Sequence, residues 1–125
     1  MTLLYIKKYT RAYIQAHPNW TFVFGDNLLR RGLKGQAFSA RGEPNAVGIA
    51  TKRAPRMSPD AYLKDIDFNE WYGKQSWSFE YLLKLSHSGK TIIWPLDGIG
   101  TGLAQLEKKA PLIWYSIEDL RMALE

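Results

Sequence analysis

Three short apolar runs constrain the fold of this chain more than any other feature of its sequence. They are Trp20–Phe24, Ala46–Thr51 and Thr91–Leu96. The runs are rich in β-branched and aromatic residues, and the first shows no polar alternation after Thr21, which is typical of strands buried on both faces. Such strands need helices on both sides of their sheet, so we expect an α/β protein with a mainly parallel sheet.

The segments between these runs have the composition and apolar spacing of helices. Leu3–Ile6 is expected to add a short strand, and Gly25 is expected to end the strand that begins at Trp20. No repeat or linker divides the chain, so residues 1–125 are expected to form one domain. The expected helices are Thr10–Ala16, Gly35–Arg41, Asn69–Ser86 and Pro111–Leu124.

Residue usage excludes several kinds of chemistry. The chain has no cysteine, which rules out disulfides, thiolate metal sites and a cysteine nucleophile. Its two histidines, His17 and His87, lie far apart in the sequence, so we expect neither a metal nor a cofactor. No stretch approaches the roughly 20 apolar residues of a membrane span, and the apolar run at the start is too short for a signal peptide. A cytoplasmic protein without a membrane partner is therefore expected.

The excess positive charge of the chain lies in one segment. Residues 26–56 hold seven basic and two acidic residues, whereas the rest of the chain holds ten of each, so this segment accounts for the net charge of +5. A basic segment that is also rich in glycine favours an anionic partner. Two alternatives remain open: a solvated basic loop without a function, and a nucleic-acid-binding surface with aromatic stacking.

Two glycine-rich turns follow buried strands. Residues 28–37 follow the stretch Phe22–Asn27, and Gly98–Gly102 follows the stretch Ile92–Asp97. Ligands of α/β sheets bind beyond the carboxyl ends of strands, and glycines there let backbone N–H groups approach phosphate oxygens. We expect the loops 27–36 and 97–104 to face each other across a cleft for a diphosphate. A side chain at Gly100 is expected to block the phosphate and to leave the fold intact.

Together these segments resemble the macrodomain family, the α/β/α fold that recognises ADP-ribose. Phe22–Arg41 is similar to its first loop with the preceding strand, and Ile93–Leu103 is similar to its phosphate-binding loop. The closest likeness is to hydrolases that remove ADP-ribose through a lysine and carry the sequence Ile-Thr-Lys-Lys-Arg-Ala before a Pro/Tyr turn. Here Ile49–Ala54 reads Ile-Ala-Thr-Lys-Arg-Ala, and Pro59–Tyr62 follows. The likeness, over roughly residues 20–120, implies a three-layer α/β/α sandwich around a mixed, mostly parallel sheet.

The resemblance implies that the chain binds ADP-ribose or a related nucleotide diphosphate, free or attached to a macromolecule. A binder of this kind would read ADP-ribosylated partners or sequester a nucleotide, and small single-domain chains of this type also occur among phage proteins. Asn27 matches the asparagine that binds the distal ribose hydroxyls, although a turn or cap role is equally natural for it. Thr101 would add a hydroxyl donor to the phosphate. The candidate ligand-binding residues are Asp26, Asn27, Gly32, Gly35, Gln36, Gly98, Ile99, Gly100, Thr101 and Gly102.

The same resemblance implies an ADP-ribosyl glycohydrolase, with Lys52 in the place of the lysine that attacks the ribose. A lysine acts in this way only when burial or nearby cations lower its pKa, and Arg53, Arg56 and Lys34 would supply such charge. Otherwise Lys52 serves as a counter-charge for phosphate. In that branch an aspartate follows the second loop, where this chain has alanine. Asp97, before the loop, is the alternative acid, and its displacement predicts weak or absent hydrolysis.

Overall fold

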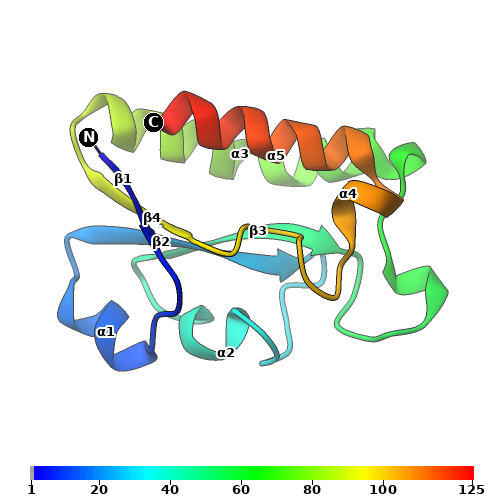
Figure 1. The fold of residues 1–125 in the computed structure, drawn as a ribbon, viewed down its shortest axis with the longest axis horizontal. Helices are drawn as coiled ribbons and strands as arrows, with labels where there is room; N and C mark the ends of the chain where they lie inside the picture. Colours follow the sequence, from blue (N-terminus) through cyan, green and yellow to red (C-terminus); the bar gives the residue numbers. More distant parts are fainter. Residues whose placement is uncertain (1) are drawn as a thin grey trace.

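The computed structural model describes residues 2–125, which form one four-stranded sheet with helices around it (Figure 1). The spatial order of the strands is β1-β4-β2-β3, and every neighbouring pair is parallel. All the carboxyl ends therefore lie along one edge of the sheet. The strands are β1 (Leu3–Ile6), β2 (Trp20–Asn27), β3 (Ala46–Lys52) and β4 (Thr91–Pro95).

Helices lie on both faces of this sheet, which explains why its central strands are largely apolar. The long helices α3 and α5 run side by side over one face, whereas the short α1 and α2 lie on the other (Figure 1). The chain is thus an α/β protein, as expected. The helices are α1 (Arg11–Ala16), α2 (Ala37–Ala40), α3 (Phe68–His87), α4 (Leu106–Lys109) and α5 (Pro111–Leu124), with 3₁₀ turns at Pro59–Ala61 and Asp65–Asp67.

The direction of strand pairing differs in part from the expected mixed, mostly parallel sheet. A mixed sheet was predicted, but within residues 2–125 the only antiparallel pairing is an isolated bridge between Lys52 and Tyr62. No helix in this part of the chain combines the length and the apolar composition that a membrane crossing requires.

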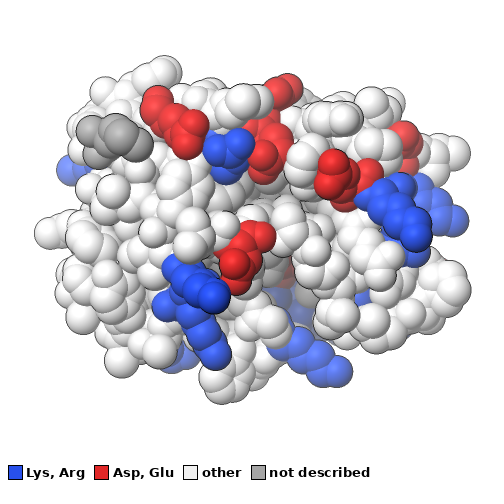
Figure 2. Space-filling view, in the orientation of Figure 1, with Lys and Arg blue, Asp and Glu red and all other residues white. Residues whose placement is uncertain are grey.

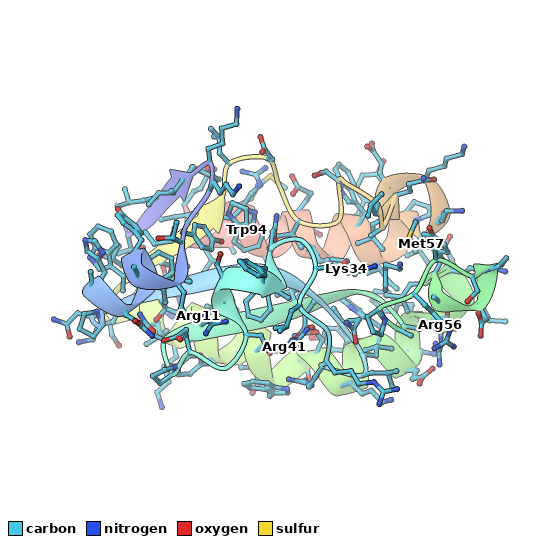
Figure 3. The ribbon with its side chains drawn as sticks, turned by 90° about the horizontal axis from the view of Figure 1, so that it is seen from below. Arg11, Lys34, Arg41, Arg56, Met57 and Trp94 are labelled. Atoms are coloured by element: carbon cyan, nitrogen blue, oxygen red, sulfur yellow. The ribbon has the colours of Figure 1, made fainter. Side chains whose placement is uncertain are left out.

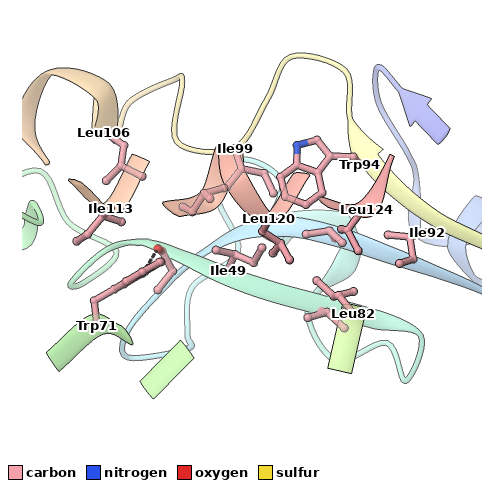
Figure 4. Close-up of a cluster of buried hydrophobic side chains, with 14 of the residues drawn as sticks. Ile49, Trp71, Leu82, Ile92, Trp94, Ile99, Leu106, Ile113, Leu120 and Leu124 are labelled. Atoms are coloured by element: carbon pink, nitrogen blue, oxygen red, sulfur yellow. Dashed lines mark hydrogen bonds between the residues drawn. The ribbon is translucent and has the colours of Figure 1, made fainter. Parts of the chain in front are cut away.

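The main core lies between the sheet and the α3–α5 layer (Figure 4). Ile49 and Ile92 point into it from the strands, and Leu82 and Leu120 meet them from the helices. Each such side chain, fully buried, contributes about 1.5–3 kcal/mol to stability. Trp71 also donates from its indole Nε1 to a backbone carbonyl of β3 at 2.8 Å, which fixes α3 against the sheet. This packing holds the strand ends, and the loops that follow them, in place.

The strand β2 continues beyond the residue that was expected to end it. Gly25 stays in the strand opposite Ile49, and the strand ends at Asn27. The side-chain Oε1 of Gln36 accepts the Gly25 N–H at 2.6 Å, and a Cβ on Gly25 would lie 3.2 Å from that oxygen. The absence of a side chain therefore admits a tertiary contact here and does not break the strand. As a result, β2 carries Asp26 and Asn27 to the carboxyl edge of the sheet.

Candidate functional site

A cleft of about 570 Å³ opens at the carboxyl edge of the sheet. Its walls come from residues 25–37 and 98–104, and residues 51–57 add a third side. The volume lies in the range of about 300–1,000 Å³ that is usual for small-molecule sites. Among the predicted site residues, those that line it are Asp26, Asn27, Gly32, Gly35, Gln36, Lys52, Gly98, Gly100, Thr101 and Gly102.

Gln36 joins the two main walls of the cleft. Its Oε1 accepts the Gly25 N–H, and its Nε2 donates to the Gly98 carbonyl at 3.2 Å. The strands β2 and β4, which lead into these walls, are adjacent and parallel. The expectation that the two glycine-rich loops face each other across one cleft is therefore confirmed.

The 98–104 wall presents a row of backbone N–H groups. Gly98 and Gly100 adopt left-handed conformations, with φ of +90° and +82°. Within the described chain, the N–H groups of residues 99–104 donate no hydrogen bond to protein atoms. The Thr101 hydroxyl donates to the Asp97 carbonyl at 2.6 Å and so closes the turn, and its expected role as a donor to phosphate stays a prediction. Successive free N–H groups in such a turn form a concavity suited to anions.

Three predicted residues of this loop have other surroundings than expected. The side chain of Ile99 is buried in the core, and Asp97 is exposed and does not line the cleft. At Gly100, a Cβ would lie 2.8 Å from Cδ2 of Leu106, a fully buried residue. A side chain at Gly100 would therefore disturb the core, and the expectation that such a variant leaves the fold intact is wrong.

The other wall is organised by an ion pair between Asp26 and Arg41. The guanidinium of Arg41 contacts both carboxylate oxygens, and its Nε donates to the Gly32 carbonyl at 2.7 Å. Both side chains are largely buried. Sequence reasoning counted Arg41 only as part of the basic segment. It also missed Gly48, where a Cβ would lie 2.6 Å from the Asp26 carboxylate, because no local pattern reveals that β3 passes so close to this pair.

Asn27 uses one half of its amide to hold the first loop. Its Nδ2 donates to the Arg31 carbonyl at 2.8 Å. Its Oδ1 is buried and accepts no hydrogen bond from any residue that the structure describes. Asn27 also lines the cleft, so a residue of the cleft wall carries an acceptor that no described residue satisfies.

Lys52 lies at the end of β3, opposite Asn27 in the register of β2 and β3. Its Nζ donates to the Arg56 carbonyl at 2.5 Å and lies 4.7 Å from the ring centre of Tyr62. Burial, and then the positive charge of Lys34, hold the pKa of Lys52 below its ordinary value. Ala104 lines the wall at the position where the resemblance places an aspartate, so the cleft has no carboxylate there.

The other cations expected to act on Lys52 are engaged elsewhere. Arg53 binds Asp67 at 3.1 Å and Glu70 at 2.9 Å. Arg56 binds Asp60 at 2.9 Å and lowers the pKa of that carboxyl to about 2. Lys34, Arg56 and Met57 lie toward the same end of the molecule (Figure 3). Lys34 alone of the three predicted cations lowers the pKa of Lys52.

Comparisons with known proteins add one finding. Neither the curated proteins nor the solved structures gave a match to this chain. Residues 4–120 match a family of unknown function, DUF7831, over nearly the whole length of the chain. The chain therefore belongs to that family of unknown function, DUF7831.

Proposed function

We propose that the cleft binds ADP-ribose or a related nucleotide diphosphate, and that the chain is a macrodomain-like module with a three-layer α/β/α arrangement. The observation that carries this proposal is that the N–H groups of residues 99–104 donate to no protein atom within the described residues, and that residues 100–104 line the cleft. Hydrogen bonds to charged groups are worth about 1.5–3 kcal/mol each, so a diphosphate gains much from a preformed row of donors. The volume of about 570 Å³ is also appropriate for a nucleotide.

The unpaired side-chain oxygen of Asn27 is an argument for a sugar hydroxyl in the ligand, next to the diphosphate. A buried acceptor without a partner costs about 1–3 kcal/mol, and a ligand hydroxyl would remove that cost. Its Oδ1 accepts no hydrogen bond from the described residues, whereas its Nδ2 already donates to the Arg31 carbonyl in the first loop. In the resemblance described above, the residue at this position binds the distal ribose. Asn27 therefore acts in our proposal as an acceptor for a ribose hydroxyl.

Hydrolysis of an ADP-ribosyl bond is the second candidate function. It is favoured by the lowered pKa of Lys52 and by its register position beside Asn27, which would bring a bound ribose near its amine. Against it, the only carboxylate that lines the cleft in residues 2–125 is Asp26, and Arg41 holds that group. Asp97 lies outside the lining. Binding is therefore the primary proposal, with Lys52 as a counter-charge to the ligand.

Isothermal titration with ADP-ribose, NAD and ADP tests the binding proposal. We expect Asn27→Ala to weaken ADP-ribose binding by about tenfold, since it removes one hydrogen-bond acceptor. The matched control is Asn69→Ala, at an exposed position on α3. Absence of binding to all three nucleotides by the folded wild-type protein would refute the proposal.

A separate assay decides between binding and hydrolysis. Release of ADP-ribose from a modified protein or oligonucleotide is measured for wild type, Lys52→Ala and Asp97→Ala. Turnover that disappears in Lys52→Ala would establish the lysine as the nucleophile. Turnover that also needs Asp97 would show that this residue moves toward the cleft on binding. Tight binding of ADP-ribose without turnover would leave a binding module.

A further inference from the structure

The sheet is irregular where it meets the cleft. The pairing of β2 with β3 shifts register at this point, because Asp26 lies opposite Ala50 whereas Asn27 lies opposite Lys52. Thr51 is the extra residue, and its hydroxyl donates to the Asp26 carbonyl at 3.2 Å. The Asn27 N–H donates to the Asp26 carboxylate at 2.8 Å, so that side chain satisfies the backbone at the shift. Irregularities of this kind re-aim the side chains beside them.

One guanidinium group holds both this carboxylate and the loop that follows it. Arg41 contacts both carboxylate oxygens of Asp26, and its Nε donates to the Gly32 carbonyl at 2.7 Å. Its Nη2 also donates to the Arg31 carbonyl at 3.3 Å. A guanidinium is planar and carries its donors in a fixed fork, so these contacts fix the end of β2 relative to the first loop.

The Arg31 carbonyl also decides how the amide of Asn27 is oriented. Nδ2 of Asn27 donates to this carbonyl at 2.8 Å, beside the bond from Arg41. A carbonyl oxygen only accepts, so the amide presents its nitrogen to it and not its oxygen. The Oδ1 remains a buried acceptor that no described residue satisfies, on a side chain that lines the cleft. Arg41 thus holds the carbonyl that determines which end of the amide stays unpaired.

Asp26 is engaged in this arrangement, although it was expected to bind the ligand. Its side chain is only 6% exposed, and it is the only carboxylate that lines the cleft in residues 2–125. Arg41 neutralises it, which removes a repulsion that a diphosphate would otherwise meet. On the face shown in Figure 2, basic side chains predominate over the half where Figure 1 places α2, the helix that Arg41 follows. The surroundings of α2 therefore keep the sign of charge that favours a diphosphate.

We infer that Arg41 is the positioning residue of a hydroxyl-selective subsite at Asn27, and that Asp26 is its anchor. The unpaired Oδ1 accepts from a ligand group that carries a hydrogen, such as a sugar hydroxyl. A site built to bond a hydroxyl rejects an analogue that lacks it, because its own buried polar group is then left unpaired. The inference rests on the proposed function, since it concerns how the same cleft distinguishes ADP-ribose from ADP.

The ratio of the dissociation constants of ADP and ADP-ribose measures this selectivity, because only ADP-ribose carries the second ribose. Isothermal titration should show that Asn27→Ala lowers the ratio about tenfold relative to wild type, which is the loss of one hydrogen bond. Arg41→Lys keeps the positive charge beside Asp26 but not the fork, so it should lower the ratio several-fold. In the double variant the two losses should not add, since both act on one subsite.

Arg11 provides a matched control (both arginines are labelled in Figure 3). It also pairs with a carboxylate, that of Glu43 at 2.6 Å, and donates to a backbone carbonyl, that of Phe38 at 3.0 Å. It does not line the cleft, so Arg11→Lys should leave the selectivity ratio unchanged. Urea unfolding identifies the variants that fold. If Arg41→Lys does not fold, Asp26→Asn replaces it, because it removes the anchor of Arg41 and should lower the ratio in the same way.

The outcomes separate this inference from the proposed function. A loss of selectivity in Arg41→Lys or its replacement, absent in Arg11→Lys and not additive with that of Asn27→Ala, supports the inference. An unchanged ratio in Asn27→Ala or in Arg41→Lys, an equal loss in Arg11→Lys, or additive losses in the double variant would overturn it, and the proposed function would stand. No binding of ADP-ribose, NAD or ADP by the folded wild-type protein would refute the proposed function itself.

Discussion

Two glycines in the phosphate-facing loop are expected to respond to substitution in opposite ways. Gly100 has a φ of +82°, and a Cβ there would lie 2.8 Å from Cδ2 and 2.9 Å from Cβ of Leu106. Gly102 is not in the left-handed region, and a Cβ there would meet nothing within 4 Å. Both glycines line the cleft. Gly100→Ala should therefore destabilise the fold, whereas Gly102→Val should spare the fold and impair binding.

The magnitudes follow from these geometries. An alanine in the left-handed region costs about 1–2 kcal/mol. Displacing the fully buried Leu106 adds roughly 1–3 kcal/mol, the usual cost of overpacking a core. Gly100→Ala should thus lower the free energy of unfolding by about 2–5 kcal/mol. At Gly102 a branched side chain stands in open space beside the free N–H row, and the loss of one hydrogen bond to a charged phosphate is worth about tenfold or more in affinity.

Urea unfolding monitored by tryptophan fluorescence measures the stabilities, because the chain contains five tryptophans. Isothermal titration with ADP-ribose measures binding by the variants that remain folded. Gly73→Ala is the matched control: this glycine lies on α3 without neighbours within 4 Å, and the change should raise stability by about 0.5–1 kcal/mol without affecting binding. A Gly100→Ala protein with the wild-type urea midpoint, or a folded Gly102→Val protein with wild-type affinity, would refute this reasoning.

Three further predictions concern the walls of the cleft. Gln36→Leu leaves the Gly98 carbonyl and a strand N–H without their partner, so urea unfolding should show a loss of about 1–3 kcal/mol, with weaker ADP-ribose binding in the same titration. Arg41→Met should lower the free energy of unfolding by roughly 1–3 kcal/mol, because the largely buried carboxylate of Asp26 loses its ion-pair partner. Thermal denaturation at two salt concentrations measures this loss. Lys34→Gln should raise the pKa of Lys52 toward 10.5, because one of the two causes of its lowering is removed, and an NMR titration of the lysine side chains measures it. Since that pKa is lowered in the folded state, the wild-type free energy of unfolding should rise as pH passes from the folded pKa to 10.5, and this rise should be smaller in Lys34→Gln.

The regular elements were predictable because their signals are local. The apolar runs beginning at Trp20 and Ala46 lie within β2 and β3, and the run beginning at Thr91 extends one residue beyond the end of β4 at Pro95. The bounds of α5 agree with those expected from Pro111 at its first turn. The end of β2 was mispredicted, because the partner that keeps Gly25 in the strand is a side chain in the following loop. The short helix α4 was not predicted either, since its four residues are too few to show a helical period.

An α/β chain with mainly parallel strands and two glycine-rich loops at one edge of the sheet could be inferred from the amino-acid sequence alone. Apolar strands demand cover on both faces, and parallel strands bring their carboxyl ends together, so these features follow from short stretches of chain. Which loop residues line the cleft became visible only in the folded chain, where Arg41 pairs with Asp26, Ile99 is buried, Gly100 lies against Leu106 and Asp97 lies outside the lining. Each of these outcomes depends on contacts with side chains or turns from other elements, and packing at those distances is not encoded in any local pattern.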